Sequence, residues 1–531
     1  MSKGMSETKI NQPSWTEYRL KNGLDPLGMQ NSGVSLYQTF LPGISNVTLR
    51  IRYYGLYAWL CRTYLQRNGD TNPESWKRVV RRAEALYALI AQKRGGETGV
   101  AGIEWAQEQI ALTPEGEINF AAAAEPGSEE YYLKQTWGVF GLAYRSQLFA
   151  IGVFTRGDGE HELPLPSAER GEALADGFAH ALGDHADLFY EIVDRGSVTH
   201  GELDLLRDAA PSEITSESSE RKLYQDLLLA ANDRPESSGF GRRQSILLVL
   251  AVAQLLGRTP KPDEVRWVLY AGFDQEGRAL ELSTQEQENQ RARWWTYQAS
   301  DLCHIALETL LKFVLDRLSL HPSGLRLPNL LSECVQEILG AADASHACWD
   351  DFLKAVVPAP NAYDGGVPTS EWKLTQDIMR SVGKVETSQI AGDTAWKAIQ
   401  LLAILQKRSA ESGRNVADVL GVFDPELFRS LHSETLFLQR HGQEPFADLL
   451  SRLLEERVIR RHLWVALRKF RYQKDYTFLI ESDEGRLRCK DKDGPVFTNP
   501  RLGPTITFLK DLHIIGGLGV TDYGAELLRS A

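Results

Sequence analysis

Apolar residues recur at intervals of three and four along most of this 531-residue chain. In residues 73–94 ("PESWKRVVRRAEALYALIAQKR") the apolar side chains share one helical face, Lys and Arg occupy the other, and Gly95 and Gly96 follow. This spacing predicts an amphipathic helix that ends at the glycine pair. Similar stripes occupy residues 172–193, 220–231, 243–256, 291–318, 394–406 and 444–471. Strand-like alternation is mostly confined to the C-terminal part, so we expect a mainly α-helical, multidomain scaffold.

Polar and proline-rich segments interrupt this helical pattern. Residues 210–220 and 232–241 are typical of loops, and residues 356–372, with three prolines and a Gly pair, are the best candidate for a linker. We therefore predict four regions: an N-terminal helical domain (1–160), a middle helical domain (161–360), a C-terminal helical region (371–470) and a small α+β module (471–531).

Aromatic residues and arginines are concentrated in residues 41–60 ("LPGISNVTLRIRYYGLYAWL"). The uncharged run is too short to cross a bilayer, which leaves a buried helix or a platform for stacking nucleic-acid bases. Apolar residues surround the expected helix on most sides, which favours burial. We predict a helix that begins near Val47, capped by Ser45 or Asn46, with its arginines reaching the surface or pairing with acidic neighbours. The rings that we expect to be mostly buried are Tyr54, Tyr57 and Trp59.

Charge is distributed unevenly along the chain. The whole sequence carries 59 Lys and Arg against 71 Asp and Glu, a formal charge of −12, which disfavours a surface that wraps nucleic acid. Residues 452–510, by contrast, contain 14 Lys and Arg against 8 Asp and Glu, a local charge of 14 − 8 = +6. A basic segment on an acidic body is what a localised phosphate contact requires, although a solvated helix face with i, i+4 ion pairs has the same composition.

The last sixty residues have the most specific pattern. Residues 476–482 and "RLRCK" read as a strand hairpin, residues 499–515 as a helix, and "GGLGVTDYGAELLRS" as a Gly-rich hairpin with a closing helix. The stretch 500–531 resembles the tail of a winged-helix domain. That resemblance implies a module that contacts DNA or a partner protein. We expect nucleic-acid contacts from Arg460, Arg461, Arg468, Lys469, Arg471, Arg501 and Lys510.

Catalytic candidates are few. Asp301, His304 and Glu308 share one face of a predicted helix. Such a trio can supply a general base or metal ligands. The alternative is a polar seam between helices, with His304 hydrogen-bonded to a carboxylate. The spacing H-x-x-x-E lacks the second histidine of a zinc-protease helix. The C-terminal hairpin offers a second nuclease candidate, but Glu481 and Glu484 are not followed two residues later by lysine. The sequence therefore assigns no metal ligands and no cofactor, and a divalent metal is expected only for a nuclease.

Several functional classes lack their sequence signatures. No phosphate-binding G-x-x-x-x-G-K-[ST] loop and no hydrolase G-x-S-x-G motif occur. The five cysteines form no C-x-x-C pair, which is typical of reduced thiols. The N-terminal residues have no apolar run, and no segment has 18 consecutive apolar residues. We therefore expect a cytoplasmic protein without a membrane contact.

Near the N-terminus, "LDPLGMQ", "LPGISNVT" and "RYYGLYAWL" resemble segments of uncharacterised helical proteins from bacterial phage-defence gene neighbourhoods. The C-terminal "TNPRLGPTITFLKDLHIIG" is similar to the same group. The resemblance implies a bacterial protein that acts beside partner subunits, one of which we expect to be an ATPase. We thus expect a non-enzymatic helical subunit of an antiphage defence or DNA-maintenance complex that contacts DNA or a partner protein through its basic C-terminal module. The alternatives are a metal-dependent nuclease and a protein-only assembly scaffold.

Overall fold

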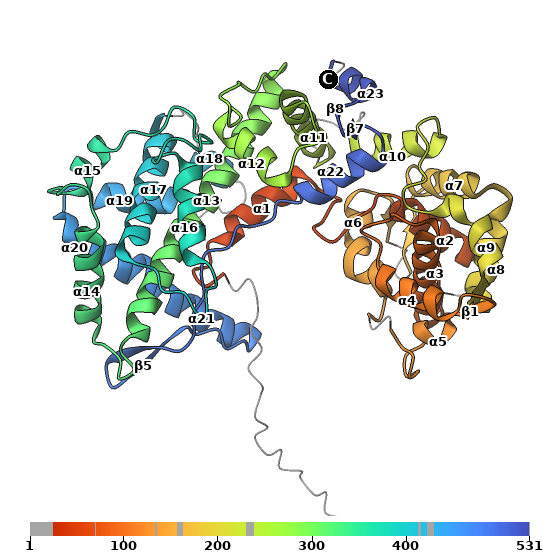
Figure 1. The fold of residues 1–531 in the computed structure, drawn as a ribbon, viewed down its shortest axis with the longest axis horizontal. Coiled ribbons are helices and arrows are strands. Elements are labelled where there is room, and N and C mark those ends of the chain that lie inside the picture. Colours follow the sequence, from red (N-terminus) through yellow and green to blue (C-terminus); the bar gives the residue numbers. More distant parts are fainter. Residues whose placement is uncertain are drawn as a thin grey trace, which may run out of the picture.

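The computed structural model describes residues 25–68, 71–132, 135–156, 163–229, 238–411, 416–421 and 429–529. The fold is mainly α-helical, as predicted, and the strands of this described part are short and form four two-stranded antiparallel sheets. Figure 1 shows the helices gathered in two lobes on either side of a smaller middle group.

The first lobe is built around α2 and α3. Asn72 caps α3 by accepting a hydrogen bond from the Glu74 amide, and Gly95 ends it with a φ of 78°. α7 packs against α2 across the predicted boundary at residue 160, and β1 pairs with β4. The elements of this lobe are α2 (Tyr53–Asn68), α3 (Pro73–Arg94), α4 (Ile103–Leu112), β1 (Glu117–Asn119), α5 (Ala121–Ala124), the π-helical η1 (Phe140–Tyr144), α6 (Arg145–Ala150), β2 (Phe154–Thr155), β3 (Leu165–Pro166), α7 (Gly171–Leu182), η2 (Gly183–His185), α8 (Ala186–Arg195), β4 (Ser197–Thr199), α9 (His200–Leu205), η3 (Arg207–Ala209) and α10 (Ser219–Leu229).

The middle group combines segments from both ends of the chain. α1 packs against α11 and α13, while α22, β8 and α23 pack against α11 and α12. Its elements are α1 (Gln30–Phe40), α11 (Ser238–Leu256), α12 (Pro262–Ala271), α22 (Leu502–Asp511), β7 (Ile515–Gly516), β8 (Gly519–Val520) and α23 (Asp522–Arg529).

The second lobe surrounds the 35-residue helix α13, which is capped by the Thr284 side chain. Helices α14, α16, α17 and the π-helical η4 pack along it. The elements are α13 (Gln285–Ser319), α14 (Leu327–Gly340), α15 (Trp349–Ala355), α16 (Glu371–Val382), α17 (Gly392–Glu411), α18 (Val416–Gly421), α19 (Leu431–Arg440), α20 (Phe446–Arg452), η4 (Leu453–Ile459), α21 (Arg460–Gln473), β5 (Ile480–Asp483) and β6 (Arg486–Cys489).

The aromatic helix α2 is buried, as predicted. Tyr54 and Tyr57 are fully buried and Trp59 is 3% exposed. The predicted start near Val47 is wrong, because Ser45 and Thr48 hydrogen-bond to each other in a turn and the helix begins only at Tyr53. Among the described residues, no helix has the length and apolar character that a bilayer span requires.

The local elements predicted for the C-terminus are present, but a separate winged-helix module is not confirmed. The β5–β6 hairpin contacts α13 and bridges to Leu325, whereas α22 lies against α12 in another part of the molecule. α22 is buried on most of its surface: Phe508 packs on Tyr54 of the first lobe, and Asp511 pairs with Arg50. The helix before the Gly-rich hairpin is therefore an internal element that joins the middle group to the first lobe.

Candidate functional site

The residues predicted to contact nucleic acid fall into two separate groups. Five of them lie on α21, while Arg501 precedes α22 and Lys510 lies in its last turn. Figure 1 shows that α21 and α22 occupy different parts of the molecule. The structure therefore does not bring all seven residues onto one surface.

Three of the Arg and Lys side chains predicted to contact nucleic acid are instead bound to other parts of the protein. Arg461 is 7% exposed and donates from Nη2 to Glu434 Oε1 at 2.7 Å. The Lys469 ammonium donates to the Asp25 carbonyl at 3.1 Å, and Arg501 Nη1 donates to the Leu41 carbonyl at 3.1 Å. The first contact attaches α21 to α19, and the other two attach α21 and α22 to the N-terminal segment around α1.

The remaining α21 cations lie on an exposed face that also carries large apolar side chains. We call this the α21 face; its central residues are Arg460, Trp464, Leu467 and Arg471, flanked by Arg468 and Phe470, and all six are exposed. Intervals of three and four residues place them on one side of the helix, opposite the buried Val465. Trp464 is 45% exposed, and Tyr472, just beyond the face, is 71% exposed. A contiguous group of exposed apolar and aromatic side chains is typical of a contact surface.

Arginines lie over the rings of this surface. The Arg468 guanidinium carbon is 5.5 Å from the Trp464 ring centroid, and that of Arg429 is 4.9 Å away. Arg471 lies 5.6 Å from the ring of Tyr472. These are cation–π distances, so the rings and the positive charges are held together as one surface.

The electrostatic character of α21 is uniformly positive. Residues 460–474 contain six Lys or Arg and no Asp or Glu. Arg460 is paired with Glu455, a contact between half-exposed side chains that solvent screens strongly. A polyanion with flat apolar groups is complementary to this combination of positive charge and exposed rings.

Sequence reasoning identified the basic residues of the α21 face but missed its aromatic ones. The signal was present: Trp464, Leu467 and Arg471 are spaced by three and four residues, out of phase with the buried positions Arg461 and Val465. Pattern alone does not show which stripe of an amphipathic helix faces the core when both stripes contain apolar residues.

The three catalytic candidates are brought together inside the second lobe. Asp301, His304 and Glu308 are 3%, 1% and 2% exposed, and His304 Nε2 lies 2.8 Å from Glu308 Oε1. Arg266 Nη2 donates to Asp301 at 2.5 Å. The expected polar seam is therefore present. Its residues are buried too deeply for a nucleic-acid substrate to reach them.

The environment moves the pKa values of this cluster in opposite directions. Burial alone would raise the pKa of Asp301, but hydrogen bonds and charge attraction from His304 and Arg266 outweigh it and hold that pKa below the ordinary value. Burial raises the pKa of Glu308 to about 7, against the attraction of His304. Glu308 thus differs from Asp301 in having no arginine partner, and the ring of His304, at 2.8 Å, is the group that opposes the effect of burial on its pKa.

The carboxylates of the C-terminal hairpin, the second nuclease candidate, have different surroundings. Glu481 accepts hydrogen bonds from the Tyr476 hydroxyl at 2.6 Å and from the Lys490 ammonium at 2.9 Å. Glu484 occupies the hairpin turn with a φ of 48° and is exposed. The two carboxylates therefore do not converge on a common ligand position.

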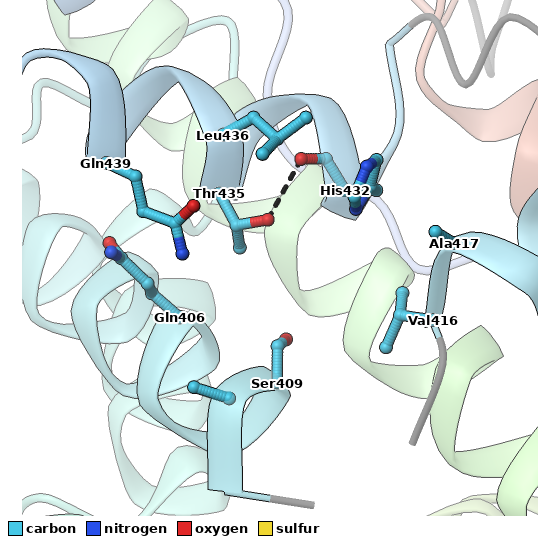
Figure 2. A pocket seen from close by; sticks show the side chains of 9 residues that line it. Gln406, Ser409, Val416, Ala417, His432, Thr435, Leu436 and Gln439 are labelled. Carbon is cyan, nitrogen blue, oxygen red and sulfur yellow. Dashed lines mark hydrogen bonds between the residues drawn. The ribbon is translucent and has the colours of Figure 1, made fainter. Parts of the chain in front are cut away.

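A pocket of about 210 Å³ lies between α17, α18 and α19 (Figure 2). Gln406 and Gln439 contribute amide groups, and the Thr435 hydroxyl donates to the His432 carbonyl at 2.9 Å. None of its nine described lining residues carries a carboxylate. The pocket therefore provides no second set of acidic metal ligands in the described part of the chain.

Comparison with known proteins adds no family. Neither the protein-family models, nor the curated proteins, nor the solved structures include a match to this chain. The geometry of the α21 face and of the cluster around His304 is therefore the basis for a functional assignment.

Proposed function

We propose that this chain is a non-enzymatic helical subunit of a bacterial antiphage defence or DNA-maintenance complex, and that it binds single-stranded nucleic acid on the α21 face. The observation that carries this proposal is the row of exposed rings and arginines on one side of a helix whose other side is buried. Such a complex acts in the cytoplasm, with partner subunits that include an ATPase, since this chain has no phosphate-binding loop.

Single strands fit this surface better than duplex DNA. Unpaired bases expose their faces, and each base stacked on an aromatic side chain contributes roughly 1–3 kcal/mol. Trp464 and Tyr472 offer such rings, and Arg468 and Arg471 lie beside them to meet phosphates. A duplex hides its base faces, so only its backbone charge would interact with this surface.

We propose that the segment that resembles a winged helix, residues 500–531, serves as a protein-contact unit. α22, β7, β8 and α23 pack on α11 and α12, and α22 also contacts the first lobe through Phe508. Winged-helix folds serve as protein–protein modules as well as DNA readers. In this chain the unit joins the middle group to the first lobe, and the nucleic acid contact belongs to α21.

Fluorescence anisotropy with a labelled 20-nucleotide DNA tests the proposal. The full chain is titrated onto single-stranded and duplex forms over a series of salt concentrations. We expect tighter binding of the single strand. Trp464→Ala should weaken it about 5- to 100-fold, which corresponds to one lost stacking contact. Arg468→Glu and Arg471→Glu should each reduce the dependence of log K on log salt by about 0.7, the effect of one lost phosphate contact on a single strand.

Matched controls separate this surface from general charge and aromatic content. Tyr132→Ala removes an exposed ring of the first lobe, and Arg380→Glu reverses an exposed charge on α16. Both should bind like the wild type. Equal affinities for the α21 variants and the controls, or absence of binding by the wild type, would contradict the nucleic-acid interface and favour a protein-only scaffold. Incubation with Mg²⁺ or Mn²⁺ should leave the DNA intact; cleavage that His304→Ala abolishes would establish the nuclease alternative instead.

A further inference from the structure

We propose that Asp25, His304 and Glu308 form a binding site for a divalent first-row transition-metal ion, with Zn²⁺ and Mn²⁺ as the candidate ions. One nitrogen or oxygen atom of each residue lies within 4.8 Å of those of the other two. The site is separate from the α21 face and does not depend on nucleic acid binding.

The two ligands on α13 are already at the spacing of a shared cation. His304 and Glu308 are one helical turn apart, and Nε2 and Oε1 are 2.8 Å from each other. Glu308 is 2% exposed, and in the described part of the chain Oε1 makes no hydrogen bond and has only the His304 ring nitrogen as a close polar neighbour. A buried carboxylate oxygen without a partner is costly. Two atoms that bind one metal ion at about 2.1 Å each lie roughly 3 Å apart, so a cation satisfies both.

The third ligand comes from a distant part of the sequence. Asp25 lies just before α1, where its Oδ1 accepts hydrogen bonds from the amides of Met29 at 2.8 Å and Gln30 at 3.3 Å. Its backbone has a φ of 42°, a left-handed conformation that aspartate tolerates better than most residues. The carboxylate is thus fixed against the start of α1 with its second oxygen available as a ligand.

The surroundings of His304 are those of a metal-ligating histidine. Its other ring nitrogen, Nδ1, faces Asp301 Oδ1 at 3.5 Å, a distance at which it makes no hydrogen bond in the described part of the chain. Asp301 in turn accepts hydrogen bonds from Arg266 and from the Thr498 hydroxyl. A carboxylate behind a histidine orients the ring and fixes the tautomer that leaves the opposite nitrogen free for a metal. The Gln30 amide contacts Nε2 at 3.3 Å, and metal binding replaces this contact.

The local charge also matches a divalent cation. Glu308 interacts electrostatically with Asp25 and Asp493, and Lys469 interacts with all three carboxylates. A metal-bound His304 is neutral, and carboxylates then outnumber cations around the site, because Lys469 is the cation that faces them and the charge of Asp301 is balanced by Arg266. This excess of negative charge favours a bound cation.

The ligand chemistry selects the class of metal. One imidazole nitrogen and two carboxylate oxygens suit Zn²⁺ and Mn²⁺ better than Mg²⁺ or Ca²⁺, which prefer oxygen ligands alone. The bound ion would join the segment before α1 to α13. The buried side of α21 contacts the same segment, since His462 Nδ1 lies 3.2 Å from the Pro26 carbonyl and Lys469 donates to that of Asp25. Metal loading would therefore stabilise the attachment of α21.

Calorimetric titration of the EDTA-treated full chain with Zn²⁺, Mn²⁺ and Mg²⁺ tests this site, with the metal content after dialysis measured by mass spectrometry. We expect one site per chain and affinities in the order Zn²⁺ > Mn²⁺ > Mg²⁺. Glu308→Gln and Asp25→Asn, which preserve side-chain size, should each lower the Zn²⁺ affinity at least 10-fold. Zn²⁺ should also raise the thermal unfolding midpoint of the wild type, and this shift should be smaller in both variants.

Glu333→Gln is the matched control. It changes a carboxylate 3.2 Å from His321, a half-exposed pair without a third ligand, and should leave the stoichiometry and affinity unchanged. Circular dichroism establishes whether each variant is folded. If Glu308→Gln does not fold, Asp25→Asn provides the test, because Asp25 is only half-buried. Absence of a Zn²⁺ site in the wild type, or equal affinity in the wild type and a folded ligand variant, would overturn the proposal. The cluster would then be a buried pair that shares a proton.

Discussion

Helices α2 and α21 are built from the same kinds of residue and have opposite surroundings. Around α2, Arg52 is buried and bound to Glu220 by two hydrogen bonds, and Trp59 is 3% exposed. On α21, Trp464 is 45% exposed and lies beside an exposed Arg468. Composition therefore does not decide whether aromatic residues and arginines form a core or a surface. A helix with apolar side chains on all sides is buried, whereas a helix that also carries exposed charged side chains keeps that side at the surface.

The largest expected effect is the loss of a core ring on α2. Trp59 packs against Phe178, Phe189 and Tyr190, so Trp59→Ala should lower the free energy of unfolding by about 3–5 kcal/mol because it leaves a cavity. Denaturant unfolding measures this value. Trp464→Ala is the matched substitution on α21 and should cost about 1 kcal/mol or less. Similar losses at both positions would remove the distinction between the two helices.

The buried ion pair beside α2 should give the second largest effect. Glu220→Gln leaves the Arg52 guanidinium without its negative partner, although Nη1 still donates to the carbonyls of Asp208 and Ala210. We expect a loss of about 3 kcal/mol in the free energy of unfolding. Glu455→Gln, which removes the partner of the exposed Arg460, should change it by no more than about 0.5 kcal/mol. A small effect of Glu220→Gln would mean that the carbonyls alone compensate for the charge.

Glu84 in the first lobe should contribute to the pH dependence of stability. Burial raises the pKa of Glu84 from 4.5 to about 7, against hydrogen bonds from the Tyr57 hydroxyl and two backbone amides. Because the folded state holds this proton more tightly, the stabilisation is complete below pH 4.5 and is lost as the pH rises towards 7. The loss approaches about 3 kcal/mol over this window.

Thermal unfolding of the wild type and of Glu84→Gln between pH 4 and 8 measures this contribution. The amide cannot titrate, so the stability of the wild type relative to the variant should fall by about 3 kcal/mol as the pH rises from 4 to 8. A difference that stays constant with pH would show that Glu84 keeps its ordinary pKa despite burial.

The smallest expected effect concerns the α21 face itself. Arg468→Ala should change the free energy of unfolding by no more than about 0.5 kcal/mol, because the side chain is exposed. The same substitution should still weaken single-strand binding in the anisotropy experiment. A clear loss of stability would instead indicate that the stacking of Arg468 on Trp464 holds α21 in place.

Local patterns predicted the helices well and the candidate sites only in part. The i, i+3, i+7 spacing correctly placed Asp301, His304 and Glu308 on one face of α13, because helical geometry fixes that relation. It did not predict Asp25 as their neighbour, since nothing in the sequence relates residues almost 280 positions apart. The start of α2 was misplaced for a similar reason: Arg50 lies before the helix and pairs with Glu97 and with the distant Asp511, a contact that the local pattern does not show.

The sequence by itself determined the helical class, the burial of the aromatic helix and the short C-terminal elements, because these follow from periodicity and turn residues over a few positions. Only the tertiary structure decided the role of each charged residue. Arg461 and Arg468 are both arginines of α21, yet one is bound to Glu434 inside the lobe and the other lies at the surface. The desolvation of a charge depends on what packs around it, and those neighbours come from distant parts of the chain.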